Sequence, residues 1–113
     1  MNLHREPTND ERASRRLDQW LWFARFAKSR SIAARLCAAG EVLVNGVAVA
    51  KANHAVKAGD VVVVPHGAWQ RTVEVLALGT RRGPAVEART LFRETRAARR
   101  ALPHWEPLLA DND

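Results

Sequence analysis

The chain has 113 residues, and its 18 Lys and Arg residues against 12 Asp and Glu give a formal net charge of +6 at pH 7. This length suits one small domain and leaves little room for a second, while the positive charge favours a polyanionic partner. A single cysteine excludes an internal disulfide and is typical of a reducing compartment. No apolar run reaches the roughly 20 residues of a membrane-spanning helix. We therefore expect a cytoplasmic protein without membrane contact.

A first helix is expected after a polar, flexible N-terminus at residues 1–14. The apolar residues that follow the i, i+3, i+4, i+7 spacing of one helix face are Leu17, Trp20, Leu21 and Ala24. We expect this helix to end near Phe26. Aromatic side chains at helical spacing pack in the core more often than they stack on RNA bases.

A second helix is predicted from about residue 30 to 39. Ser29 is a good N-cap because its hydroxyl can accept a hydrogen bond from a free amide of the first turn, and Gly40 can end the helix in a left-handed conformation. Cys37 lies on the apolar side and is expected to be a core thiol. The two helices should form a hairpin.

The hydrophobic period changes to two after Gly40, which indicates strands. Asn45-Gly46 between valine runs is typical of a tight hairpin turn. A further strand is expected at residues 61–64, closed by Pro65 and Gly67, and a last strand pair at residues 69–78.

A C-terminal helix is predicted within residues 79–102, with Pro84 near its first turn. The arginines that fall at i, i+4, i+7 and i+11 on one face of this helix are Arg89, Arg93, Arg96 and Arg100. They form either a solvated face or a secondary RNA contact. Residues 103–113 are expected to be a flexible tail.

These elements predict an α+β fold: two N-terminal helices on a small antiparallel, barrel-like sheet in residues 15–78, with an additional C-terminal helix. Basic residues cluster around the expected helix hairpin. The candidate phosphate-binding residues are Arg16, Arg25, Lys28, Arg30 and Arg35, and the start of the second helix, with Ser29, adds neutral donors. The alternative is that Arg16 and Asp18 form a local salt bridge and that residues 28–30 only cap a helix.

Several short motifs occur in one order between residues 16 and 64. They are Arg16-Leu17-Asp18, Lys28-Ser29-Arg30, Ala33, Arg35-Leu36, Gly40, Val42, Val44-Asn45-Gly46, Lys51, Val56 and Gly59-Asp60. This pattern resembles the S4 RNA-binding domain. The resemblance implies an S4-like fold that binds structured RNA, and it adds Asp18, Asn45 and Lys51 to the expected RNA-binding residues.

Further motifs resemble the bacterial ribosome-associated heat-shock protein 15 family: Trp20-Leu21-Trp22, Ala24-Arg25-Phe26 and Arg81-Arg82-Gly83-Pro84-Ala85. The resemblance implies binding of ribosomal or transfer RNA on the large ribosomal subunit, in rescue or recycling of stalled ribosomes after heat stress. The acidic residues Asp111 and Asp113 stand where longer relatives carry a basic tail, so we expect an effect on RNA affinity.

We expect no enzymatic activity, cofactor or metal, because the four histidines are scattered and no metal-ligand spacing or phosphate-binding glycine loop occurs. One alternative is an RNA-anchoring module related to RNA-modification enzymes. Another is a DNA-binding module that uses the same basic surface. A monomer is the expected state.

Overall fold

The computed structural model describes residues 13–99. The expected flexible ends, up to residue 12 and from Arg100 onward, lie outside the described residues. The elements in chain order are β1 (Arg15–Arg16), α2 (Leu17–Phe23), α3 (Arg30–Ala38), β2 (Leu43–Val44), β3 (Val47–Ala48), β4 (Ala55–Val56), β5 (Val61–His66), β6 (Trp69–Val75), α4 (Ala85–Ala88), the 3-10 turn η1 (Arg89–Leu91) and β7 (Phe92–Arg99).

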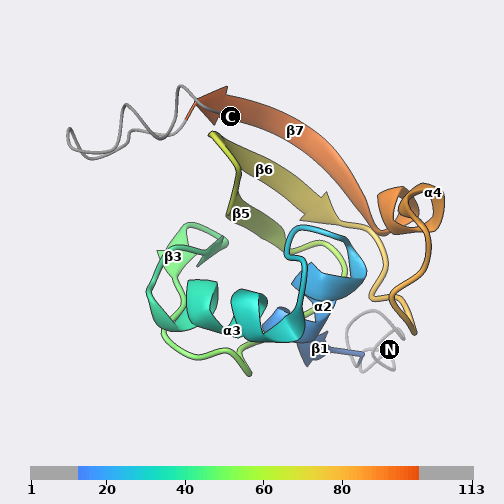
Figure 1. Cartoon of the computed structure of the whole chain (residues 1–113), viewed down its shortest axis with the longest axis horizontal. Helices are drawn as coiled ribbons and strands as arrows, with labels where there is room; N and C mark the ends of the chain where they lie inside the picture. Colours follow the sequence, from blue (N-terminus) through green and yellow to red (C-terminus); the bar gives the residue numbers. More distant parts are fainter. Residues whose placement is uncertain (1–12, 100–113) are drawn as a thin grey trace, which may run out of the picture.

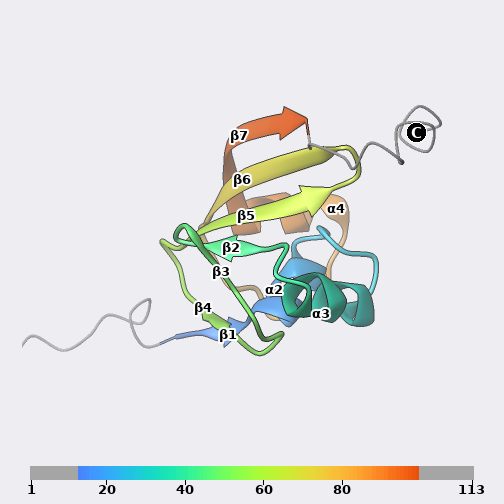
Figure 2. The ribbon, with the colours of Figure 1, turned by 90° about the vertical axis from the view of Figure 1, so that its left-hand side faces the viewer.

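The strands form two antiparallel sheets. The larger sheet has the order β3-β2-β5-β6-β7, and β1 pairs with β4 in a separate two-stranded ribbon. Helices α2 and α3 pack together on one side of the larger sheet, while α4 lies near the start of β7 (Figures 1 and 2). The predicted α+β class, with a helix pair on an antiparallel sheet, is therefore confirmed.

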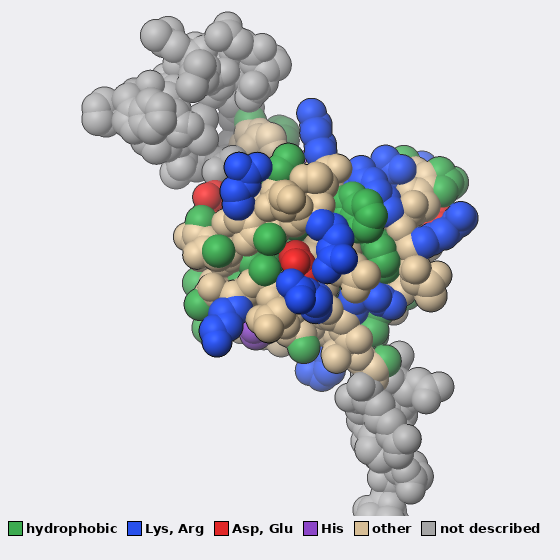
Figure 3. All heavy atoms as spheres, turned by 60° about the horizontal axis from the view of Figure 1, so that its bottom comes forward, with side chains coloured by type: hydrophobic (Ala, Val, Ile, Leu, Met, Phe, Trp, Pro, Cys, Tyr) green, Lys and Arg blue, Asp and Glu red, His purple; other side chains and the backbone are tan. Residues whose placement is uncertain are grey.

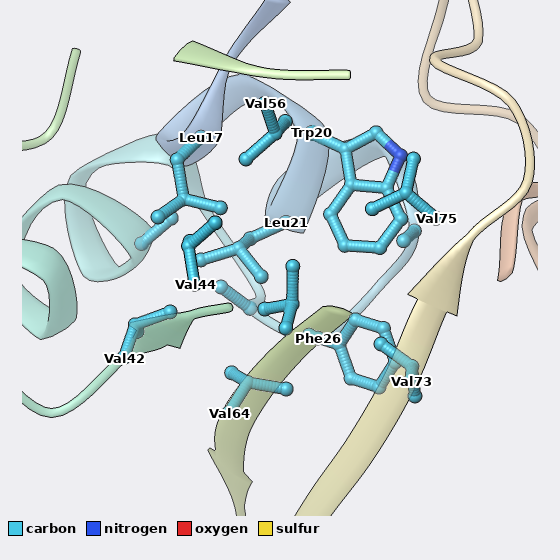
Figure 4. Close-up of a cluster of buried hydrophobic side chains, with 14 of the residues drawn as sticks. Leu17, Trp20, Leu21, Phe26, Val42, Val44, Val56, Val64, Val73 and Val75 are labelled. Atoms are coloured by element: carbon cyan, nitrogen blue, oxygen red, sulfur yellow. The ribbon is translucent and has the colours of Figure 1, made fainter. Parts of the chain in front are cut away.

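The core fills the space between α2, α3 and the sheet. Strand alternation turns Val62, Val64, Val73 and Val75 inward, where they meet Leu17, Trp20 and Leu21 from α2 (Figure 4). Burying each of these large apolar side chains contributes about 1.5–3 kcal/mol. Trp20 is fully buried, and its indole N–H donates to the carbonyl of Ala77 at 2.9 Å, so the buried polar atom is satisfied. Trp20 and Cys37 are core residues, as expected.

The helix hairpin differs from the prediction at one end. Helix α3 begins after Ser29, whose Oγ accepts from the Ile32 amide at 3.1 Å, and Gly40 follows its end with φ 75°. Helix α2, in contrast, ends at Phe23 rather than near Phe26. The amides of Arg25 and Phe26 donate to the carbonyls of Trp22 and Leu21 and close the last turn.

The predicted strands also need two corrections. Strand β5 continues through Pro65 to His66, and residues 69–75 form the single strand β6 instead of a strand pair. Pro65 pairs with Gln70 near the hairpin turn, where a missing amide hydrogen removes little pairing.

The predicted C-terminal helix is wrong for most of its length. Only residues 85–88 are α-helical, and after η1 the chain enters β7, which pairs with all of β6. The spacing of the arginines is helical, but pairing with β6 satisfies backbone groups of both strands and overrides this local pattern.

Candidate nucleic-acid interface

A buried carboxylate lies at the centre of the predicted basic surface. Asp18 is 3% exposed, and its two oxygens accept from Arg16 Nε and Nη2, both at 3.0 Å, and from the Gln19 amide at 2.8 Å. Arg30 Nη2 lies 4.0 Å from the same carboxylate. Asp18 is thus placed to orient Arg16 and Arg30, whose side chains are 51% and 44% exposed, rather than to face a ligand itself.

The start of α3 adds free donors beside these cations. Lys28 is exposed and forms no ion pair with any described residue. Because the Ser29 hydroxyl serves as the N-cap for Ile32, the amides of Arg30 and Ser31 remain unpaired within the described chain. Backbone amides at a helix start attract anions, so the cap and the cations favour the same ligand.

The loop between β3 and β4 brings Lys51 to this region. The carbonyls of Ala52 and His54 accept from the amides of Asp18 and Leu17 at 3.2 and 2.7 Å. These bonds tie the loop to the first turn of α2. Lys51 in this loop and Arg35 on α3 are both exposed, and neither has an acidic partner among residues 13–99.

We define the basic face by Arg16, Lys28, Arg30, Arg35 and Lys51. Lys and Arg side chains are spread over the helical side of the molecule, with few acidic side chains among them (Figure 3). Phosphate binding strengthens with the number of cations that reach one backbone. The structure therefore places five of the expected residues, all exposed, on the helix pair, at its ends or in the loop bonded to it.

Arg25 takes an unexpected conformation. It has φ 67°, the left-handed region that glycine adopts most easily, directly after the end of α2. Its Nε donates to the Gly83 carbonyl at 2.8 Å. This bond turns Arg25 toward the loop before α4, so it lies on the side of the helix hairpin that faces this loop.

The side-chain contacts of Asn45 are mainly structural. It occupies the tight turn with φ 52°, its Oδ1 accepts from the Val61 amide at 2.9 Å, and its Nδ2 donates to Asp60 at 3.1 Å. Burial opposes ionisation of Asp60, but hydrogen bonds from the Lys57 amide and from Asn45 hold the pKa of this carboxyl below its usual value. RNA contact by Asn45 stays a prediction.

The arginines of the predicted C-terminal helix are divided between two sides of the sheet. Arg93 donates to Glu74 at 2.6 Å, and Arg96 pairs with Thr72 across the strands. A register irregularity between these pairs places Arg93 and Arg96 on the same outer face. Arg89 instead lines a hollow together with Arg25, and Arg100 lies outside the described residues.

Two arginines near the site were not among the RNA-binding residues expected from the sequence. Arg82 donates through Nη1 to the carbonyls of Trp22 and Ala27, and its guanidinium lies 5.6 Å from the centre of the Trp22 ring. Arg71 binds Glu94 with two hydrogen bonds of 2.8 and 2.7 Å. In the sequence, Arg82 stands out only within the family motif of residues 81–85, because the partners of its side chain lie 55 and 60 positions earlier.

Three other features were sought in the described part of the chain: a metal site, a membrane-spanning helix and a reactive cysteine. Among residues 13–99 no three His, Cys, Asp or Glu side chains are placed to hold a metal ion. No helix in this part is long and apolar enough to cross a membrane. Burial, with a smaller effect of the Asp18 charge, raises the pKa of Cys37 to about 11, so this thiol is a poor nucleophile.

Comparisons with known proteins show which family the chain is similar to. Residues 15–62 match the family model of the S4 domain. The chain is 37% identical over 83 residues to a heat shock protein 15 homolog of Haemophilus influenzae, covering 74% of this chain and 63% of that relative. It is 43% identical over 60 residues to the RQC P-site tRNA stabilizing factor of Halalkalibacterium halodurans, covering 53% of this chain and 67% of that protein.

A solved structure is also similar. The trimeric structure of Vibrio cholerae heat shock protein 15 matches with a TM-score of 0.70 and 36% sequence identity, over 74% of this chain and 83% of that one. The chain spans under two thirds of the length of the Haemophilus relative.

Proposed function

Because the chain belongs to the heat shock protein 15 family and contains an S4 domain, we propose that it is an RNA-binding protein that recognises structured RNA. The observation that carries the proposal is the basic face, in which the buried Asp18 lies 3.0 Å from Arg16 and 4.0 Å from Arg30, two of its exposed cations. Cations and backbone amides on a rigid frame read the positions of phosphates, which suits recognition of RNA shape.

The proposed roles follow from the contacts. Arg16, Lys28, Arg30, Arg35 and Lys51 bind phosphates, and Ser29 supports them by holding the helix start. Asp18 positions Arg16 and Arg30. Arg89, Arg93 and Arg96 are a secondary contact at most, since Arg93 already pairs with Glu74 and the three do not share one face.

A charge-matched pair of variants tests the proposal. Lys28→Gln combined with Arg30→Gln removes two cations from the basic face, while Lys57→Gln combined with Arg81→Gln removes two exposed cations elsewhere. Binding of a fluorescein-labelled RNA hairpin is measured by anisotropy at several salt concentrations. The first variant should bind at least tenfold more weakly, and the slope of log K against log[salt] should fall by about 0.7–0.9 per lost phosphate contact.

Equal affinities of the two double variants, both folded by circular dichroism, would contradict the assignment of the basic face. Competition with duplex DNA belongs in the same assay. Preference for DNA over the RNA hairpin would favour the alternative of a DNA-binding module.

We further propose that the RNA is ribosomal or transfer RNA on the large ribosomal subunit, in a stress-related rescue role. Support comes from the names of the relatives, one a heat shock protein and one a P-site tRNA stabilizing factor. These names describe no enzyme, so a non-catalytic role is part of the proposal. Co-sedimentation of the full chain with purified large subunits, but not with small subunits, is expected; sedimentation only as free protein at low salt would contradict it.

A further inference from the structure

A cleft lies beside the basic face, between the turn that follows α2, one side of α3 and the hairpin turn of β5 and β6. Its volume is about 690 Å³. The floor is apolar and comes from all three segments, with Phe26, Ile32, Leu36 and Pro65 among its residues. An open apolar floor of this kind can cover one face of a flat ring.

Cations stand around this apolar floor without acidic partners. Arg25, Lys28 and Arg82 line the cleft, and no Asp or Glu is among its described lining residues. Burial, followed by the charge of Arg25, lowers the pKa of Arg82, so the two guanidinium groups repel each other. An anion placed between them would remove this repulsion.

The arginines are held in place by the fold. Arg25 is fixed by its left-handed backbone and by the bond from Nε to Gly83, which leaves Nη1 and Nη2 without a partner in the described chain. Strained backbone that the surrounding structure maintains is often found where a ligand is gripped. Arg82 is fixed by the carbonyls of Trp22 and Ala27.

His66 adds a neutral donor at the cleft. Arg71 Nη1 lies 3.0 Å from His66 Nδ1, and because a guanidinium only donates, Nδ1 accepts and the ring hydrogen sits on Nε2. No described residue accepts from Nε2. The ring packs edge-on against Phe26, with centroids 5.7 Å apart.

We propose that this cleft receives an unpaired nucleotide of the bound RNA, its base on the floor formed by Phe26 and Ile32 and its phosphate among Arg25, Arg82 and Lys28. The inference rests on the proposed RNA binding and adds a preference for RNA with a displaced base. Lys28 belongs to both the cleft and the basic face, so one backbone can reach both. An apolar floor with a cationic rim matches a base and its phosphate.

The test uses two RNA hairpins of equal length, one fully paired and one with a single bulged 2-aminopurine. The full chain should bind the bulged hairpin about tenfold more tightly, within the range for burying one base, and change its 2-aminopurine emission. Ile32→Trp fills the cleft and should cancel the preference while binding of the paired hairpin changes less than twofold. Ile32→Glu places an anion on the floor and should also cancel the preference, although its charge beside Lys28 weakens binding of both hairpins. Val61→Trp, on an exposed position of β5, is the matched control and should keep the preference.

The outcomes separate the two proposals. Tight, salt-dependent binding of both hairpins with equal affinity overturns the cleft inference and leaves the proposed function standing. No binding of either hairpin overturns both. A preference that survives Ile32→Glu in a folded protein places the bulged base elsewhere and also overturns the inference.

Discussion

Replacing the buried carboxylate Asp18 by an amide tests how the basic face is held. In Asp18→Asn, the remaining oxygen can still accept from Gln19, but the amide nitrogen faces the Arg16 guanidinium, so one charge-assisted hydrogen bond is lost. Such a bond contributes about 1.5–3 kcal/mol. Because Arg16 is 51% exposed, solvent screening reduces this value, and we expect a loss of about 1–2 kcal/mol in the free energy of unfolding.

The assay is urea unfolding followed by circular dichroism, with Glu74→Gln as the control. Glu74 also pairs with an arginine, but its side chain is 31% exposed and lies on the outer face of the sheet. Its replacement should cost about 0.5 kcal/mol or less. Asp18→Asn should also weaken RNA binding, although every cation remains. An Asp18→Asn protein as stable as the control, with unchanged RNA affinity, would refute the assignment of Asp18 as the positioning residue.

Three further predictions concern single side chains. At pH 8, Cys37 of the native protein should react with iodoacetamide at least 100-fold more slowly than Cys37 of the urea-unfolded protein, because its pKa of about 11 leaves little thiolate and its side chain is buried. Equal rates would contradict its burial. Burial and the Arg71 charge lower the pKa of His66. The neutral ring therefore stabilises the fold at pH values above the usual histidine pKa near 6.5, and this contribution is lost as the pH falls through the lowered pKa of the folded protein. Urea titrations should show that His66→Asn loses less stability than wild type between about pH 7 and pH 5. Because Arg25 has φ 67°, Arg25→Ala should be about 1 kcal/mol less stable than Arg25→Gly, and equal unfolding midpoints would argue against strain there.

Local signals in the sequence predicted the parts of the fold that local physics decides. Ser29 and Gly40 mark the two ends of α3, because the cap hydrogen bond and the positive φ are needed within a few residues. The same holds for the Asn45-Gly46 turn. The burial of Trp20 and Cys37 followed from helical spacing.

The failures involve contacts between distant parts of the chain. The arginines of residues 89–100 have helical spacing, and only pairing with β6 shows that residues 92–99 form a strand. Likewise, Arg25 ends a helix without the usual glycine, and its partner Gly83 lies 58 positions away. For this reason the basic face could be predicted from the sequence, whereas the cleft beside it could not.

The position of β7 has a consequence for the behaviour of the protein at high concentration. This strand is eight residues long and lies at the end of the larger sheet, so one of its edges has no strand neighbour among the described elements. Such an edge can template intermolecular strand addition and aggregation. Arg93 and Arg96 put positive charge on this strand, so two copies approaching edge to edge repel each other. Salt that screens this repulsion, or bound RNA that neutralises it, should make the protein more prone to self-association.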